Sequence, residues 1–362
     1  MRWLIVGLFS FLIGFNHCVY GQDIIVSDDG RDFVNKATGE RFVVWGVNYD
    51  HDVKGRLLED YWVEEWDTVC GDFAEMKELG ANVVRIHLQT GKFLDSPTQP
   101  NSKSLTQLSK LLKLAEENGL YLNITGLGCY HKQDIPQWYD QLSESDRWDA
   151  QCIFWEAVAK TAAKSSAVFC YDLMNEPAIP TRGKQTEWLV GKPLGDKYFV
   201  QRITLCTEGR KGKDIARAWI NKLVSAIRKH DSQNMVTVGV IPWAHVWPNA
   251  KPFFYDKSVS AELDFVSVHF YPEAGKIDKA VDALKVYDIG KPLVVEEMFG
   301  LKCGIDQIDE FIDRSSEVCD GWISFYWGQS FEEYKSNENK TISAAVINGW
   351  LGYFKEKGET IH

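Results

Sequence analysis

The sequence lacks an excess of basic residues. Its 40 lysine and arginine residues are outnumbered by 51 aspartate and glutamate residues, so the formal net charge is −11. A protein that binds nucleic acid needs clustered basic side chains to neutralise phosphate charges, and no such cluster is found along the chain. We therefore expect no nucleic-acid partner. The 45% hydrophobic content also excludes a disordered chain or a repetitive fibre.

Apolar runs long enough to cross a membrane are absent after residue 21. The apolar run at residues 3–15 follows Arg2 and is shorter than the roughly 20 residues that span a bilayer. Residues 19–21 then supply small side chains at the spacing that a signal peptidase recognises. We predict a signal peptide over residues 1–21, cleaved near Gly21, and a secreted mature chain, extracellular or periplasmic, without stable membrane insertion. The alternative is that the run is retained as a membrane anchor.

Paired cysteine motifs are also missing. Cys18 lies in the predicted signal peptide, and the other seven cysteines are scattered without any CxxC pair. Their odd number and wide spacing do not indicate a disulfide framework, and several lie in apolar segments where cysteine packs as a small hydrophobic residue. The spacing leaves room for one or two disulfides but does not identify their partners.

The chain does contain a regular alternation of short apolar runs and amphipathic segments. Runs rich in β-branched and aromatic residues predict eight buried strands at residues 43–49, 82–88, 121–126, 168–174, 235–241, 265–271, 292–297 and 321–327. Helical periodicity lies between them at residues 66–79, 105–118, 147–164, 214–230, 277–287 and 305–318, with Gly80 and Gly119 as C-caps. The segment between the fifth and sixth strands is irregular and predicts a short or distorted helix.

Eight successive strand–helix units predict a single (β/α)8 TIM barrel domain over residues 22–362. A short N-terminal β-hairpin precedes the barrel, with residues 24–26 and 41–44 as its expected strands. A doubly wound open sheet is the alternative, but no glycine-rich GxGxxG turn follows the first strand. The sequence does not indicate an oligomeric state.

Polar and aromatic residues occur where the predicted strands end, which is the catalytic edge of a parallel barrel. They are Asn48, Tyr49, Arg85, His87, Tyr130, His131, Asn175, Glu176, Trp243, His269, Tyr271, Glu297 and Trp327. Two of the ends are acidic, Glu176 after the fourth strand and Glu296-Glu297 at the end of the seventh. A buried carboxylate must be paired or face a pocket. Because successive strand residues face opposite sides, we expect only one of Glu296 and Glu297 to point into the barrel mouth.

These motifs together resemble a known enzyme family. The motifs are Asn175-Glu176-Pro177, Arg85 on the second strand, His269-Phe270-Tyr271 on the sixth, an acid on the proline-led seventh, and Trp327 on the eighth. They are similar to clan A glycoside hydrolases, and most similar to glycoside hydrolase family 5, the cellulase and mannanase family. The resemblance extends over residues 23–362. It implies a retaining β-glycosidase that needs no cofactor or metal and hydrolyses a β-linked polysaccharide or oligosaccharide, with β-mannan or β-glucan favoured.

The resemblance also implies roles for individual residues. Glu176 corresponds to the general acid/base, and Glu297, five residues after Pro292, corresponds to the nucleophile. Met298 separates Glu297 from the aromatic-glycine pair that usually follows directly, so Glu296 remains the alternative nucleophile. Asn175 would bind the sugar 2-hydroxyl and Trp327 would form the floor of the catalytic subsite. His131 and His269 would be supporting residues.

The chemistry of a retaining glycosidase gives Arg85 and Tyr271 a place beside the nucleophile. The reaction needs one protonated and one ionised carboxyl group. We expect Arg85 to keep Glu297 ionised and Tyr271 to donate a hydrogen bond to it. Arg85 could instead neutralise a core acid such as Asp172, and the sequence leaves the role of His87 open.

Aromatic residues are abundant after the fourth and fifth strands. They are Trp188, Trp243, Trp247, Phe253, Phe254 and Tyr255. Flat rings there could stack on sugars or could simply pack the loops. Residues 179–210 form a connection longer than ordinary, which we interpret as a cover over the cleft. Two other functions remain open, a catalytically silent carbohydrate-binding barrel and a metal-dependent barrel hydrolase, although the histidines lack metal-binding spacing.

Overall fold

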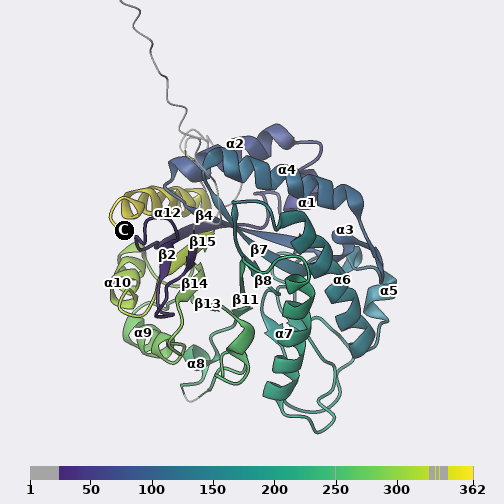
Figure 1. Cartoon of the computed structure of the whole chain (residues 1–362). Coiled ribbons are helices and arrows are strands. Elements are labelled where there is room, and N and C mark those ends of the chain that lie inside the picture. The colour runs from purple at the N-terminus through teal and green to yellow at the C-terminus, as the bar shows by residue number, and fades with distance from the viewer. Residues whose placement is uncertain (1–23, 249, 326–330, 332–333, 335–340, 362) are drawn as a thin grey trace, which may run out of the picture.

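The computed structural model describes residues 24–248, 250–325, 331, 334 and 341–361. The predicted signal peptide and Trp327 lie outside these residues. A ring of parallel strands surrounded by helices forms the body of the molecule (Figure 1). The strands are β3 (Val44–Tyr49), β4 (Val83–Gln89), β7 (Tyr121–Gly128), β8 (Val168–Asp172), β11 (Met235–Thr237), β12 (Gly239–Val240), β13 (Val266–His269), β14 (Leu293–Met298) and β15 (Gly321–Phe325).

The sheet closes into a barrel through its fifth strand. Its order is β11-β8-β7-β4-β3-β15-β14-β13-β12, and every neighbouring pair is parallel. The two ends of this order, β11 and β12, are consecutive parts of one strand interrupted at Val238. The predicted (β/α)8 barrel is therefore confirmed. Burial of both strand faces explains the near-continuous apolar runs in the sequence.

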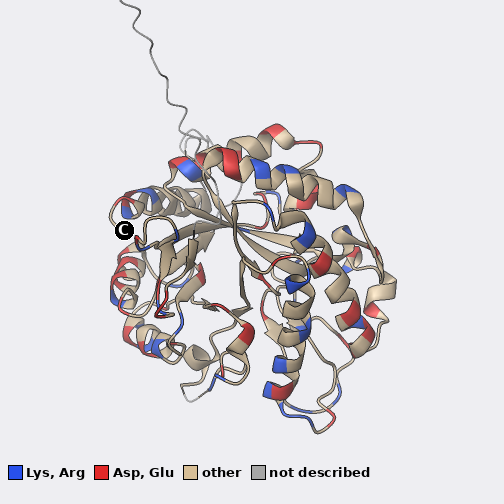
Figure 2. Cartoon of the chain, viewed as in Figure 1, with Lys and Arg blue, Asp and Glu red and all other residues tan. Residues whose placement is uncertain are grey.

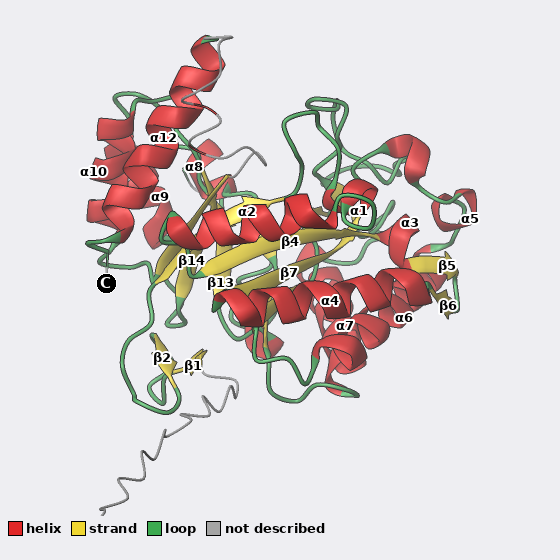
Figure 3. Cartoon of the chain, turned by 90° about the horizontal axis from the view of Figure 1, so that it is seen from above, coloured by secondary structure: helices red, strands yellow, loops and turns green. Residues whose placement is uncertain are grey.

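Seven longer helices surround the barrel in the part of the chain that the structure describes. They are α2 (Trp66–Glu78), α4 (Ser102–Asn118), α6 (Glu144–Ala162), α7 (Gly212–Arg228), α9 (Ile277–Lys285), α10 (Ile305–Ser315) and α12 (Ile342–Gly358). The six predicted helices agree with the first six of these to within three residues at each end. Figure 3 shows α2 and α4 side by side over β4 and β7. Charged residues of both signs lie along the outer helices, whereas the central strands carry few (Figure 2).

Local sequence signals explain several helix ends. Asn101 caps α4, because its side-chain oxygen accepts the backbone N–H of Ser104 at 2.9 Å. Gly119 ends the same helix in the left-handed region at φ 61°, a conformation that glycine adopts without steric cost. Among the described residues, no helix is both long and apolar enough to cross a membrane.

The N-terminal hairpin is present, but its second strand differs from the prediction. β1 (Ile24–Val26) pairs antiparallel with β2 (Phe33–Asn35), and Arg41 forms only a single bridge with Val34. The physical reason is burial of Phe33. Its ring lies 5.2 Å from the rings of both Phe169 and Phe265, so β2 seals the end of the barrel where the strands begin. The expected strand at residues 41–44 instead leads into β3.

Short elements occupy the connections. They are α1 (Leu58–Tyr61), α3 (Thr90–Phe93), α5 (Gln137–Asp140), α8 (Trp243–Val246), the 3-10 turns η1 (Lys132–Asp134) and η2 (Ser260–Glu262), and strands β5 (Leu94–Ser96), β6 (Gln99–Pro100), β9 (Pro177–Ala178) and β10 (Gln201–Arg202). The predicted short helix between the fifth and sixth strands is α8. The seven cysteines in the described part of the chain are all unpaired.

Candidate active site

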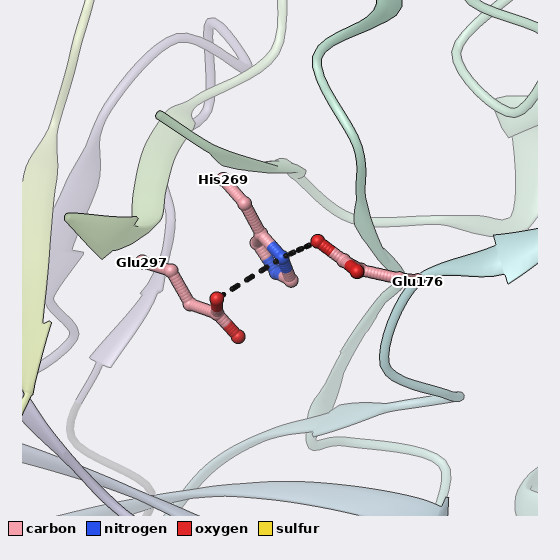
Figure 4. Close-up of side chains that lie close together, drawn as sticks. All are labelled: Glu176, His269 and Glu297. Carbon is pink, nitrogen blue, oxygen red and sulfur yellow. Dashed lines mark hydrogen bonds and ion pairs between the residues drawn. The ribbon is translucent and has the colours of Figure 1, made fainter. Parts of the chain in front are cut away.

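The two predicted acidic groups meet at the end of the barrel where the strands finish. Glu176 follows β8 and Glu297 belongs to β14, and their side chains approach His269 of β13 from two sides (Figure 4). One carboxylate oxygen of each glutamate and a ring nitrogen of His269 all lie within 4.8 Å of one another. The side chains of Glu176 and Glu297 are only 15% and 11% exposed. Strands four and seven thus bring two carboxyl groups into one largely buried site.

The backbone at Glu176 is held in an uncommon conformation. Its φ is 47°, in the left-handed region that residues with a side chain rarely adopt. The Glu176 N–H donates to the carbonyl oxygen of Gly239 at 2.9 Å, which ties this turn to the fifth strand. Its Oε1 lies 2.9 Å from Nδ1 of His269. A left-handed backbone at a residue with a side chain costs free energy and persists only where surrounding contacts hold it. The contacts of Glu176 therefore fix the position of its carboxyl group.

Glu297 is held by a hydrogen bond to each of its carboxylate oxygens. Nη1 of Arg85 donates to Oε1 at 2.7 Å, and the Tyr271 hydroxyl donates to Oε2 at 2.8 Å. Burial nevertheless raises the pKa of Glu297, although His269, Arg85 and the Tyr271 hydrogen bond act in the opposite direction. We expected Arg85 to dominate, but desolvation of the carboxylate outweighs it. The group therefore ionises at a higher pH than an ordinary glutamate.

Arg85 contacts both of the carboxylates considered as its partners, Glu297 and Asp172. It is fully buried, and besides Glu297 it donates from Nη2 to Asp172 Oδ2 at 2.8 Å and to Asn175 Oδ1 at 2.9 Å. Its Nη1 also donates to Asn48 Oδ1 at 3.0 Å. One guanidinium group on β4 thereby links β3 and β8 to the candidate nucleophile on β14. Its planar set of donors suits this arrangement in a way that a lysine ammonium does not.

His269 is positively charged at neutral pH. Glu297, Glu176 and Glu296 surround it and raise its pKa to about 10, although burial opposes this shift. The site of Glu176, His269 and Glu297 has the donor types of a metal centre. A metal ion would have to displace the ring proton to bind here.

Glu296 also faces the site, which the alternation of strand residues did not predict. Val268 pairs with Val295 and His269 pairs with Glu297, so Glu296 is an extra residue in β14. This β-bulge turns both carboxylates toward the barrel interior. Glu296 is fully buried and accepts a 2.5 Å hydrogen bond from Asn123 Nδ2. Glu297 is the partly exposed glutamate, with a side chain 11% exposed, and Glu296 is fully buried. Only Glu297 therefore reaches the barrel mouth, and Glu296 is a supporting group behind it that does not face the helices.

Not every predicted site residue lies beside the two acids. His131 precedes η1, and its Nδ1 has no hydrogen-bond partner among the described residues. His87 lies closer to the site, where its Nδ1 pairs with the Tyr130 hydroxyl at 2.6 Å and its Nε2 lies 3.2 Å from Asn48 Oδ1. Sequence reasoning left His87 undecided because a lone histidine on a strand has no distinctive spacing.

Asn175 connects the site to the long connection after β8. Its Nδ2 donates to the carbonyl oxygen of Phe199 at 2.9 Å. Within this connection β9 and β10 pair in parallel, and the Tyr198 N–H donates to the Tyr130 carbonyl at 2.8 Å. Residues 179–210 therefore pack against the neighbouring strand end, as a cover over that side of the site would.

The aromatic residues after the fourth and fifth strands divide into two groups. Trp188, Phe254 and Tyr255 are buried and pack the loops. Trp243, Trp247 and Phe253 are 37%, 60% and 44% exposed and line a cavity of about 650 Å³ that also includes Pro177, the residue after Glu176. The rings of Trp243 and Trp247 stack with centroids 5.2 Å apart. The second group offers flat apolar surface in a cavity that is also lined by Pro177, the neighbour of Glu176 in the chain.

A parallel barrel with two neighbouring carboxyl groups at its strand ends defines a glycoside hydrolase of the barrel type. The family model Cellulase (glycosyl hydrolase family 5) matches residues 37–330. The chain belongs to glycosyl hydrolase family 5. Comparison with curated protein sequences gives no match.

Several solved structures share the fold. An exo-β-1,4-mannosidase from an Opitutaceae bacterium has a TM-score of 0.65 at 16% identity, over 92% of this chain and 62% of that chain. The catalytic domain of a Thermobifida fusca endoglucanase has a TM-score of 0.59 at 16% identity, over 94% and 98% of the two chains. A β-1,4-mannanase from the sea hare Aplysia kurodai has a TM-score of 0.59 at 18% identity, over 90% and 96%.

Proposed function

We propose that this protein is a retaining β-glycosidase that hydrolyses a β-linked polysaccharide or its oligosaccharides, with β-mannan or β-glucan as the favoured substrate. The close approach of the two carboxyl groups is the observation that carries the proposal. Oxygens of Glu176 and Glu297 lie within 4.8 Å of each other. Retaining enzymes hold their two carboxyl groups about 5 to 5.5 Å apart, whereas inverting enzymes need about 6.5 to 9.5 Å to admit a water molecule.

In the first half-reaction Glu297 is the nucleophile and Glu176 is the acid. The Glu297 carboxylate attacks the anomeric carbon, the bond from that carbon to the leaving oxygen breaks, and Glu176 gives its proton to that oxygen. Tyr271 and Arg85 each hold one oxygen of Glu297, which orients it for attack. The product of this step is a glycosyl-enzyme ester and a free leaving sugar.

In the second half-reaction Glu176 is the base. It removes a proton from water, the water oxygen attacks the anomeric carbon, and the bond to Glu297 breaks. Both residues return to their starting protonation states. No step requires a cofactor. Asn175 binds the sugar 2-hydroxyl in this proposal, as the family resemblance implies. Its Oδ1 accepts a hydrogen bond from Arg85, and its Nδ2 donates one to the Phe199 carbonyl.

The favoured substrate rests on the family and on the exposed tryptophans. The structures of similar fold include enzymes named as a mannosidase, a mannanase and an endoglucanase. Trp243 and Trp247 supply aromatic faces of the kind that stack on sugar rings. We further propose that the chain is exported after cleavage near Gly21, which N-terminal sequencing of the protein recovered outside the cytoplasm would test.

A glycan screen of the wild type beside Glu176→Gln and Glu297→Gln tests the proposal. We expect turnover of a β-mannan or β-glucan, and a loss of about a thousandfold or more in each variant. Azide added to Glu297→Ala is expected to restore cleavage of an activated aryl β-glycoside and to give the α-glycosyl azide. Glu296→Ala is the matched control and is expected to form no azide product.

Two results would overturn the proposal. Turnover of both Gln variants within a few-fold of wild type would exclude the assigned roles. Binding of glycans without cleavage across the whole panel would favour the silent carbohydrate-binding barrel. Azide rescue of Glu296→Ala instead of Glu297→Ala would move the nucleophile by one residue.

A further inference from the structure

Glu296 is a buried carboxylate that the reaction does not consume. The β-bulge in β14 directs it beneath the two catalytic acids, where it is fully buried. Oε1 accepts the 2.5 Å bond from Asn123 and lies 3.5 Å from Nε of Arg85. Oε2 lies 3.5 Å from Nε2 of His269. A fully buried charge is costly unless its partners compensate for it, so its retention here needs a reason.

The opposite edge of His269 faces the catalytic acids. Nδ1 lies 2.9 Å from Oε1 of Glu176 and 3.5 Å from Oε2 of Glu297. The two ring nitrogens thus point to different groups, Nδ1 to the carboxylates that react and Nε2 to Glu296, which does not. Both nitrogens can donate only when the ring is an imidazolium.

The space for this arrangement depends on a glycine. A Cβ at Gly239 would lie 2.4 Å from Oε2 of Glu296, 2.7 Å from Nε2 of His269 and 3.2 Å from Nη2 of Arg85. The fifth strand thus has no side chain at the point where Glu296 meets His269. The carboxylate and the ring can approach each other directly.

We propose that Glu296 is a positioning residue that holds His269 as an imidazolium between the two catalytic carboxylates. The inference rests on the proposed function and extends it to a third glutamate. Glu296 acts through His269 and does not itself touch the substrate.

The movement of charge in the reaction explains the use of a fixed cation. In the first half-reaction negative charge leaves Glu297, which becomes an ester, and appears on Glu176, which has given up its proton. An imidazolium whose Nδ1 is near both oxygens stays paired with whichever carboxylate is charged. It stabilises the developing Glu176 carboxylate without having to move. A neutral ring protonated on Nδ1 could still donate a hydrogen bond, but it would carry no net charge to balance the carboxylate. Glu296 keeps the ring charged.

Other titratable and charged groups surround His269. Glu297, Glu176 and Glu296 raise its pKa by attraction, and burial of the ring opposes them. Burial holds the pKa of His87 on β4 well below its usual value, so that ring is neutral at pH 7. Arg85, also on β4, shares Glu296 with the His269 ring. Arg85 is itself paired with Asp172 and Glu297. Glu296 is the one carboxylate of this set that lies against Nε2 of the ring. Its removal therefore changes the charge on His269 without removing a reacting group.

The experiment compares Glu296→Gln with Asp172→Asn. Both substitutions neutralise a fully buried carboxylate near Arg85, but Asp172 bonds to Nη2 of Arg85, Thr125 and the Gly239 N–H and has no contact with His269. The charge state of His269 is followed by ¹⁵N NMR of the imidazole nitrogens against pH, with His269→Asn to assign the signals. Activity is measured as kcat/KM against pH on the substrate found in the glycan screen.

In the wild type we expect His269 to remain protonated on both nitrogens well above neutral pH. In Glu296→Gln its deprotonation is expected to move down by about one pH unit or more. The loss of kcat is expected at the pH values where the variant ring has lost its proton and the wild-type ring has kept it. Asp172→Asn is expected to lower activity without moving the His269 titration. Glu296→Asp, which keeps the charge, is expected to keep the imidazolium.

Three outcomes would overturn the inference. One is a neutral His269 in the wild-type protein at pH 7, a measurement that needs no variant to fold. The second is an unchanged His269 titration in folded Glu296→Gln. The third is an unchanged activity and pH profile in Glu296→Gln while Glu297→Gln loses turnover. That result would contradict the inference and leave the proposed function standing. If no glycan is cleaved in the screen, the proposed function fails. The NMR titration needs no substrate, so this failure can be distinguished from a failure of the inference.

Discussion

The Tyr271 hydroxyl donates a 2.8 Å hydrogen bond to Oε2 of Glu297. Burial raises the pKa of that carboxyl group, and this bond is one of the contacts that oppose the rise. Tyr271 and Arg85 hold different oxygens of the carboxylate. The tyrosine can therefore be removed while the guanidinium contact remains, which separates the hydrogen bond from the ion pair.

Tyr271→Phe is expected to move the acid limb of kcat/KM to higher pH by about one unit. Attack requires an ionised Glu297, and loss of a hydrogen bond to the carboxylate raises its pKa further, so a smaller fraction is ionised at each acidic pH. Tyr353→Phe is the matched control. Tyr353 also donates to a carboxylate, Asp309 at 2.8 Å, but lies on α12 in the helical layer. A shift to lower pH in Tyr271→Phe would contradict the assigned role.

Gly239→Ala is expected to lower both stability and activity. The added Cβ would lie 2.4 Å from Glu296 and 2.7 Å from His269, closer than side chains approach in folded proteins. Strain of this kind costs about 1 to 3 kcal/mol or more. Gly71→Ala in α2 is the control, because its Cβ meets nothing within 4 Å, and it is expected to gain about 0.5 to 1 kcal/mol. Urea denaturation measures both. Equal stability of the two variants would refute the prediction.

Trp247→Ala and Trp243→Ala are expected to raise KM for the polysaccharide by about tenfold, which corresponds to the loss of one stacked aromatic face. The two rings are exposed and stack at an interplanar angle of 21°. Little change in kcat is expected on a small aryl glycoside that does not reach them. Trp66→Ala, on α2, is the control for loss of a tryptophan elsewhere. Unchanged KM values for the polymer would show that these rings do not contact the polysaccharide.

Glu59→Gln is expected to stabilise the fold above neutral pH. Burial raises the pKa of Glu59 to about 7, although its Oε1 accepts the Gln89 N–H at 2.6 Å. A carboxyl group with a raised folded-state pKa favours folding while it is protonated, and this contribution is lost as pH rises from its ordinary pKa toward 7. The stability of the glutamine variant is expected not to fall over this pH range. Thermal unfolding from pH 4 to 8 measures it, with exposed Glu64→Gln as the control for net charge.

Much of the fold could be predicted because its signals are local. Strand and helix periodicities follow from which faces are buried, and they recur along the chain often enough to indicate eight units. The hairpin partner was predicted incorrectly. The prediction paired residues 24–26 with residues 41–44, whereas β1 pairs with residues 33–35, where Phe33 packs against Phe169 and Phe265.

The site could be predicted in part for the same reason. Polar residues that interrupt apolar strands at their ends are visible in a sequence, and Glu176, Glu297, Arg85, His269 and Tyr271 do meet in the structure. Asn123 and Gly239 were missed, because neither residue type signals a contact across the barrel. Trp327 lies outside the described residues and stays a prediction.

The order of strands and helices and the acids at two strand ends can be predicted from the amino-acid sequence, because these features depend on neighbours along the chain. Which charged side chains pair with one another depends on the folded barrel. A single extra residue in β14 turns Glu296 inward beside Glu297, and Arg85 and His269 are brought to them from strands far apart in the chain. The physical reason is that pairing register and desolvation arise only when the barrel closes.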